Sequence, residues 1–183
     1  MKIQSIDKPI YRKKLNIVST AFIAVFAVLS LIFGSIIIAI LGGDISTANA
    51  AVDAEVQSNF RYNLAGVVIA LVTMAMIANM MKGHVYVKEI YYVWRLKQLH
   101  NRIYRKLVKI KGGQASDDDT VSANAKTILA FYYTTLKQVY ELDNNTLTIT
   151  KVNADIEKIK QQIGEDIFEQ TIERFDKSLL DSF

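Results

Sequence analysis

The stretch "IVSTAFIAVFAVLSLIFGSIIIAIL", Ile17–Leu41, decides the fold class, because it contains no charged residue and is almost entirely apolar. At about 1.5 Å of rise per residue, a helix of this length exceeds the roughly 30 Å hydrocarbon core of a bilayer. A second uncharged run, Leu64–Met81, is just long enough to cross. The sequence therefore predicts two membrane-spanning helices, at 17–41 and 64–81, joined by a loop at 42–63.

The overall composition agrees with a helical membrane protein. The chain has 183 residues, of which 51% are hydrophobic, and this fraction is high for a soluble domain. It has no cysteine, which excludes disulfides, thiolate metal sites and cysteine nucleophiles. The only proline is Pro9, which we expect to precede all regular structure, leaving long uninterrupted helices. We expect an all-α fold, in which a two-span transmembrane helical hairpin at 17–81 is followed by a cytoplasmic bundle of about four helices at 82–183.

The charge distribution predicts how the hairpin is oriented. The N-terminal segment 1–16 carries a net charge of +4, the loop 42–63 carries −2 and the segment 82–111 carries +8. Basic residues near membrane spans concentrate on the cytoplasmic side. We therefore expect both termini in the cytoplasm and the short loop outside. The alternative is a cleaved signal peptide ending at Ala48-Asn49-Ala50, but its apolar run would be too long.

The segment that follows the second span is both basic and aromatic. Lys82–Lys111 contains nine Lys or Arg residues and one Glu, together with four tyrosines and Trp94. At helical spacing its apolar residues form one stripe: Val85, Tyr92, Leu96, Leu99, Ile103, Leu107 and Ile110. A basic stripe beside it, with Trp94, is the candidate lipid or partner contact: Lys88, Arg95, Arg102, Lys106 and Lys109. This pattern predicts an amphipathic helix near 82–111.

Three further helices are predicted, near 116–143, 147–163 and 165–181. The first has Ser116 as its expected N-cap, and Asp117–Asp119 occupy the first turn, where the helix dipole favours negative charge. The last has an acidic flank of Glu165, Glu169, Glu173 and Asp176. This flank is either a solvated face or packs near the basic stripe of the 82–111 helix.

No motif in the sequence indicates catalysis. The chain contains no glycine-rich phosphate loop, zinc-protease helix or nucleophile elbow. His84 and His100 would point to nearly opposite faces of one helix, the first at the membrane interface and the second at the surface. The three consecutive aspartates would also point apart, which argues against a divalent metal site. We expect no enzyme activity, no metal and no cofactor.

The spans contain small residues one helical turn apart. These are Ser30 with Gly34 in the first span and Gly66 with Ala70 in the second, a spacing typical of closely packed membrane helices. They would join the two spans of one chain or form a dimer between chains. No ionisable residue lies inside either span, so a channel would require an oligomer with polar residues facing a common axis.

Four blocks resemble a known family over nearly the whole chain. They are "YRKKLN" at 11–16, "VWRLKQLHNRIYRKL" at 93–107, "ILAFYYTTLKQVYELD" at 128–143 and "NTLT" at 145–148. They resemble domain of unknown function family 3087, a group of short two-span inner-membrane proteins of Gram-negative bacteria. The resemblance implies the bacterial inner (cytoplasmic) membrane and a helical architecture, and it implies no catalytic residue.

Three functional hypotheses follow. The first is a non-enzymatic inner-membrane protein whose cytoplasmic helices bind a protein partner or another copy of the chain; it predicts that Phe131, Tyr132 and Tyr133 pack around Trp94 and bury the apolar stripe. The second is a sensor of anionic lipid, which predicts that stripe exposed beside the bilayer. The third is a small oligomeric channel. Nucleic-acid binding is disfavoured, because Tyr92 and Tyr104 lie on or beside the apolar stripe, where core packing explains them.

Overall fold

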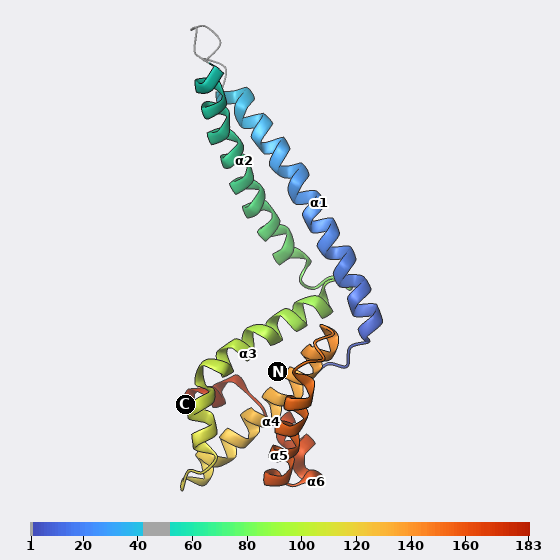
Figure 1. Cartoon of the computed structure of the whole chain (residues 1–183), viewed down its shortest axis with the longest axis vertical. Coiled ribbons are helices and arrows are strands. Elements are labelled where there is room, and N and C mark those ends of the chain that lie inside the picture. Colours follow the sequence, from blue (N-terminus) through green and yellow to red (C-terminus); the bar gives the residue numbers. More distant parts are fainter. Residues whose placement is uncertain (1, 42–51) are drawn as a thin grey trace. The chain divides into compact units, whose positions relative to one another are not determined.

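The computed structural model describes residues 2–41 and 52–183, with side chains omitted at 52–59, and every regular element in these ranges is helical. The all-α prediction is confirmed: two long apolar helices are followed by further helices (Figure 1). The elements are α1 Lys8–Leu41, α2 Val52–Met81, α3 Lys88–Gly113, α4 Asp119–Leu142, α5 Ile149–Ile163, α6 Glu165–Glu173 and the 3-10 helix η1 Lys177–Ser182.

Helix α2 begins earlier than the sequence predicts. Val52 lies inside the expected loop 42–63, so the apolar run of the second span continues a helix that has already started. The remainder of that loop, with Ala48-Asn49-Ala50, lies outside the described residues. The chain divides into two units, one formed by Lys13–Lys88 and the other by residues 2–12 with Glu89–Phe183.

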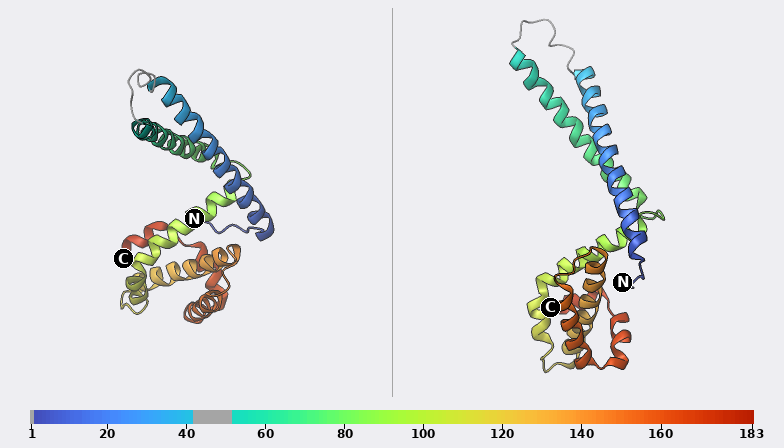
Figure 2. Two further views of the ribbon diagram at one scale, coloured as in Figure 1. Left: turned by 45° about the horizontal axis from the view of Figure 1, so that its top comes forward. Right: turned by 45° about the vertical axis from the view of Figure 1, so that its right-hand side comes forward.

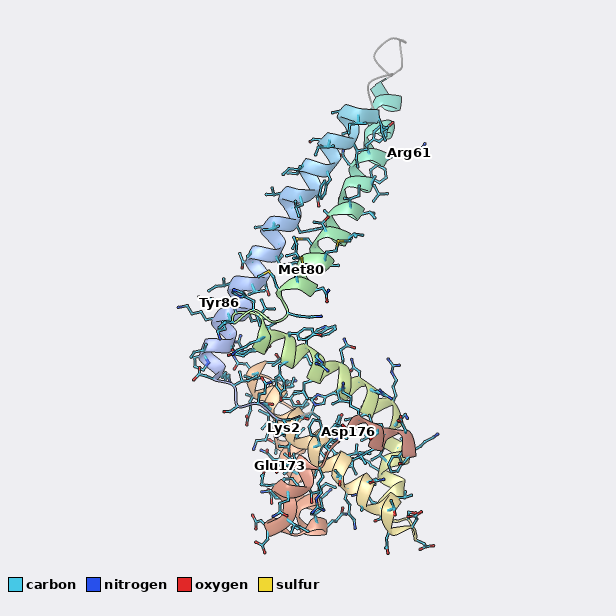
Figure 3. The ribbon with its side chains drawn as sticks, turned by 180° about the vertical axis from the view of Figure 1, so that it is seen from behind. Lys2, Arg61, Met80, Tyr86, Glu173 and Asp176 are labelled. Carbon is cyan, nitrogen blue, oxygen red and sulfur yellow. The ribbon has the colours of Figure 1, made fainter. Side chains whose placement is uncertain are left out.

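The first unit is an antiparallel hairpin of α1 and α2 whose apolar side chains are exposed. Only 6% of the apolar window in α1 and 17% of that in Phe60–Met81 is buried within the chain. A core helix of a soluble protein would be mostly buried, so this surface is suited to lipid. Figure 3 shows the side chains of both helices along the hairpin, with Arg61 and Met80 marking the two ends of this part of α2. Both helices are long and apolar enough to cross a membrane.

The two helices meet at a pair of glycines. Gly34 and Gly66 are buried against each other, and a Cβ atom added to Gly66 would lie 2.7 Å from the Gly34 Cα. Ala70, one turn beyond Gly66, is fully buried. The Ser30 hydroxyl donates to the Phe26 carbonyl of its own helix at 2.8 Å. Gly34, Gly66 and Ala70 therefore take part in packing within one chain, where only glycine allows the two backbones to approach so closely.

The second span and the basic helix are separate helices. Residues 82–87 form turns, with the His84 N–H donating to the Met81 carbonyl and the Val87 N–H to the His84 carbonyl, each at 2.9 Å. The basic helix consequently begins at Lys88 and not near 82.

The start of α1 also differs from the prediction for Pro9. Asp7 caps the helix, since its carboxylate accepts from the Ile10 N–H at 2.9 Å. Pro9 thus lies in the first turn of α1, where its missing N–H costs no hydrogen bond. The expectation that Pro9 precedes all regular structure is wrong.

The second unit is built around α4, which packs on α5, α6 and η1 (Figure 2). The apolar stripe predicted for the basic helix is largely buried in this unit, with Leu96, Ile103 and Ile110 inaccessible. Phe131 of α4 is buried and stacks on Phe175, with 3.9 Å between ring centroids. The prediction that the stripe is buried is confirmed for Tyr92, Leu96, Leu99, Ile103 and Ile110. It is wrong for Val85, which lies in the turns before α3 and is 62% exposed. The expected packing around Trp94 is also wrong, because Trp94 is 53% exposed.

Two predicted helix boundaries in this unit are corrected. The N-cap of α4 is Asp118 and not Ser116, because extended backbone at Asp118 lets its carboxylate accept from the Thr120 and Val121 N–H groups at 2.8 and 3.2 Å. The last predicted helix, 165–181, is interrupted after Glu173. Asp176 then caps η1 by accepting from the Ser178 N–H at 3.0 Å.

The acidic flank of the last helix does not pair with the basic helix. In the described part of the chain, the ion pairs from α3 to later residues are Lys97 with Asp143 at 2.7 Å and Arg102 with Asp181 at 3.5 Å. The predicted flank residues Glu165, Glu169 and Glu173 lie on α6 and are exposed. A solvated face is therefore the alternative that the structure favours for them.

The glycine contact predicts a specific loss of stability. Gly66→Ala should destabilise the hairpin by about 1–3 kcal/mol, because the added methyl group would overlap the α1 backbone. The measurement is SDS-induced unfolding of the full chain in mixed micelles, followed by circular dichroism. Gly83→Ala is the matched control, because open space surrounds a Cβ atom at that position. Equal stability of both variants would contradict the contact.

Candidate functional site

His100 is a buried histidine in the interface between α3 and α4. Its Nε2 lies 2.8 Å from the Thr135 Oγ1, and its ring meets the Tyr132 ring edge-on, with centroids 5.4 Å apart. The prediction of a surface histidine is wrong, because His100 is on the buried side of α3. Burial lowers the pKa of His100 to about 4, and the nearby Lys97 charge acts in the same direction.

The hydrogen bonds around Thr135 indicate which ring nitrogen of neutral His100 carries the proton. The Thr135 hydroxyl donates its single hydrogen to the Phe131 carbonyl, at 2.7 Å. The same oxygen therefore accepts from His100, which places the proton of the neutral ring on Nε2. Neutral His100 thus joins α3 to α4 as part of the core.

The N-terminal segment is tied to the helices of the second unit. The Gln4 N–H donates to the Tyr92 hydroxyl at 3.2 Å, and the Gln138 side-chain amide donates to the Gln4 carbonyl at 2.6 Å. The Tyr92 hydroxyl in turn donates to the Gln138 Oε1 at 3.4 Å. Burial raises the pKa of Tyr92, while the hydrogen bond from Gln4 lowers it. No sequence pattern predicts this three-residue network, because its members are far apart in the chain.

The open face of α3 carries a groove of about 330 Å³. Its lining residues come from α3, except for one lysine from η1: Tyr91, Trp94, Arg95, Gln98, Leu99, Arg102 and Lys177. The Tyr91 and Trp94 rings stack with centroids 5.6 Å apart, and the Arg95 guanidinium lies 5.9 Å from the centroid of the Tyr91 ring. Buried Leu99 belongs to the same lining. The groove therefore combines an aromatic pair with three cationic side chains.

The structure separates the candidate contact residues of the basic stripe. Trp94, Arg95 and Arg102 line the groove together. Lys106 instead donates to the Leu180 carbonyl at 2.7 Å and so holds the C-terminal segment on α3. Lys88 at the start of α3 and Lys109 near its end are exposed and outside the groove.

Sequence reasoning missed three of the lining residues. Tyr91 and Gln98 lie one helical turn before and after Arg95, so a helical projection centred on Arg95 would have found both. Lys177 carries no such signal, because it reaches the groove only through the fold of η1. Among the described residues, no group of three His, Asp or Glu side chains is placed to hold a metal ion.

Residues 1–180 of the sequence match a family described as Protein of unknown function (DUF3087). The chain belongs to this family. The resemblance seen in the sequence is confirmed, and the match includes both apolar helices and all seven groove residues. No curated protein and no solved structure matches the chain.

The buried imidazole predicts acid-sensitive stability. The ordinary pKa of histidine, near 6.5, applies to the unfolded chain, so between about pH 6.5 and pH 4 the unfolded state binds a proton that the folded state excludes. The contribution of His100 to the free energy of unfolding is fully present above pH 6.5. It is lost as the pH falls toward 4, and the total loss is about 3 kcal/mol.

The variant His100→Leu should therefore flatten the pH dependence of unfolding between about pH 6.5 and pH 4. The measurement is chemical denaturation of the full chain in detergent across this range. His84→Gln is the control, because it also replaces a histidine but at an exposed position outside the buried interface of α3 and α4. Identical slopes for wild type and His100→Leu would show that His100 does not carry the effect.

Proposed function

We propose that the chain is a non-enzymatic protein of the bacterial inner membrane, in which the hairpin anchors a cytoplasmic helical module that binds a protein partner or another copy of the chain. The observation that carries this proposal is the contrast between the two units. The hairpin leaves its apolar side chains exposed, whereas the module buries the apolar stripe of α3 in a core of its own. The anchor thus needs lipid, and the module does not.

The charge distribution supports the proposed orientation. The net charges of +4 on 1–16 and +8 on 82–111 flank the two spans, while 42–63 carries −2. The positive-inside rule then assigns both termini to the cytoplasm. The module would accordingly face cytoplasmic partners.

Two exposed apolar side chains on the module support partner binding. Tyr104 is 68% exposed and Val108 is 87% exposed, and they lie one turn apart on α3. Such neighbours on a helix form one contact surface. They are separate from the residues that hold α3 against the core.

The structure offers less support for the two alternatives. A lipid sensor that docks through the apolar stripe would have to expose Leu96, Ile103 and Ile110, which are fully buried. For a channel, hydroxyl groups would have to face a pore, but Ser30 and Thr73 donate to carbonyls of their own helices, at 2.8 and 2.9 Å.

The orientation is testable with single cysteines, since the chain contains none. In intact spheroplasts, Arg61→Cys should react with a membrane-impermeant maleimide, because it is exposed and precedes the uncharged run Leu64–Met81 on the proposed outer side. Ser182→Cys, in the C-terminal 3-10 helix, should react only after permeabilisation. The reverse pattern would overturn the proposed topology.

Partner binding is testable by photo-crosslinking in cells. A photoreactive residue at Val108 should form one discrete adduct, either with a second copy or with a partner, and Tyr104→Ser should reduce its yield. The control position is Glu157, which is exposed on α5 away from this pair. Absence of any adduct at Val108, or equal adducts at both positions, would count against an interface on α3.

A further inference from the structure

The groove on α3 has the composition of a ligand site. Arg95 and Arg102 are seven residues apart on one helix, which corresponds to about 10 Å along its axis. Lys177 approaches the same groove from η1. Three cations around one small depression repel one another, and a bound anion would relieve that repulsion.

The three cations are only weakly neutralised by the protein. In the described part of the chain they form one ion pair, between Arg102 and Asp181, with 3.5 Å between the nearest nitrogen and oxygen. Both side chains are more than half exposed, and exposed pairs of this kind contribute little to stability. A ligand can therefore displace Asp181 easily.

Size and shape restrict the class of ligand. A volume of about 330 Å³ is at the lower end of the range for small-molecule sites. The stacked Tyr91 and Trp94 rings present an apolar face beside the cations. Guanidinium groups bind both carboxylate and phosphate oxygens through two parallel hydrogen bonds. A phosphate monoester has three acceptor oxygens and more negative charge than a carboxylate, which suits a site with three cations.

We propose that this groove binds a small organic phosphate, whose phosphate group contacts Arg95, Arg102 and Lys177 and whose organic part lies against Trp94. The same chemistry is offered by a phospholipid headgroup and by a soluble phosphate ester. Binding would leave the apolar core of the module intact, because all three cations lie outside it. This site is distinct from the Tyr104 and Val108 surface proposed for a protein partner.

The test uses Trp94, the only tryptophan in the chain, as a reporter inside the groove. The full chain is placed in neutral phosphatidylcholine nanodiscs whose scaffold protein lacks tryptophan, and phenyl phosphate is titrated. We expect a saturable change in Trp94 fluorescence. Benzoate, which has the ring but carries less negative charge and fewer acceptor oxygens than phenyl phosphate, should bind at least about fivefold more weakly.

Two matched pairs of variants separate the groove from general positive charge. Arg95→Gln and Lys177→Gln should each weaken phenyl phosphate binding about tenfold, because each removes a charged donor. Arg105→Gln and Lys109→Gln remove exposed charges of α3 outside the groove and should change binding by less than about twofold. Asp181→Asn should tighten binding about twofold to fivefold, since it removes the carboxylate that competes for Arg102.

A second arm identifies the source of the phosphate. If the ligand is a lipid headgroup, phosphatidylglycerol in the nanodisc will change the Trp94 signal and block phenyl phosphate. If it is a soluble ester, phosphatidylglycerol will leave the titration unchanged. Either result supports the site.

Three results would overturn the proposal: no saturable response to phenyl phosphate or phosphatidylglycerol, equal affinity for benzoate, or equal losses in the groove and control variants. Unchanged circular dichroism of each variant confirms that the fold is intact. Because the groove variants leave Tyr104, Val108 and the hairpin untouched, a negative result would not affect the topology or crosslinking outcomes.

Discussion

The burial of the apolar stripe of α3 in the helical unit is the constraint on which the rest of that unit depends. Because Leu96, Ile103 and Ile110 point into the core, the opposite face of α3 must point outward. This orientation of α3 about its own axis exposes Trp94, Arg95 and Arg102 and buries His100 beside Thr135. The groove and the acid-sensitive histidine are thus two consequences of one helix orientation.

The C-terminal segment packs on the same core and is held against α3. Phe175 stacks on Phe131, and the chain then turns at Asp176, labelled in Figure 3, into η1. Lys106 holds the Leu180 carbonyl, so a cation of the basic helix fixes the backbone that follows Lys177. Lys106 and Lys97, which pairs with Asp143, therefore hold other parts of the unit, whereas Arg95 remains exposed in the groove.

Local sequence patterns predict much of this arrangement, and most of the features that they miss depend on contacts between distant residues. The two apolar runs, the amphipathic α3 and the long α4 follow from periodicity and length, which depend on neighbouring residues. The placement of His100 and the Gln4, Tyr92 and Gln138 network depend on contacts between distant residues. The N-cap at Asp118 is local, but Ser116 and Asp118 are both good capping residues, so residue type alone does not select between them. Only Tyr91 and Gln98 were recoverable from helical spacing around Arg95.

By itself, the sequence determined that the chain is helical, that two of its helices suit a membrane and that one helix is basic on one side, because composition and period are local properties. Only the tertiary structure decided which cations share a groove. Lys177 reaches Arg95 and Arg102 through the turn at Asp176, and Lys106 is withdrawn to a backbone carbonyl. Such placements arise from how separate helices pack, which no single segment encodes.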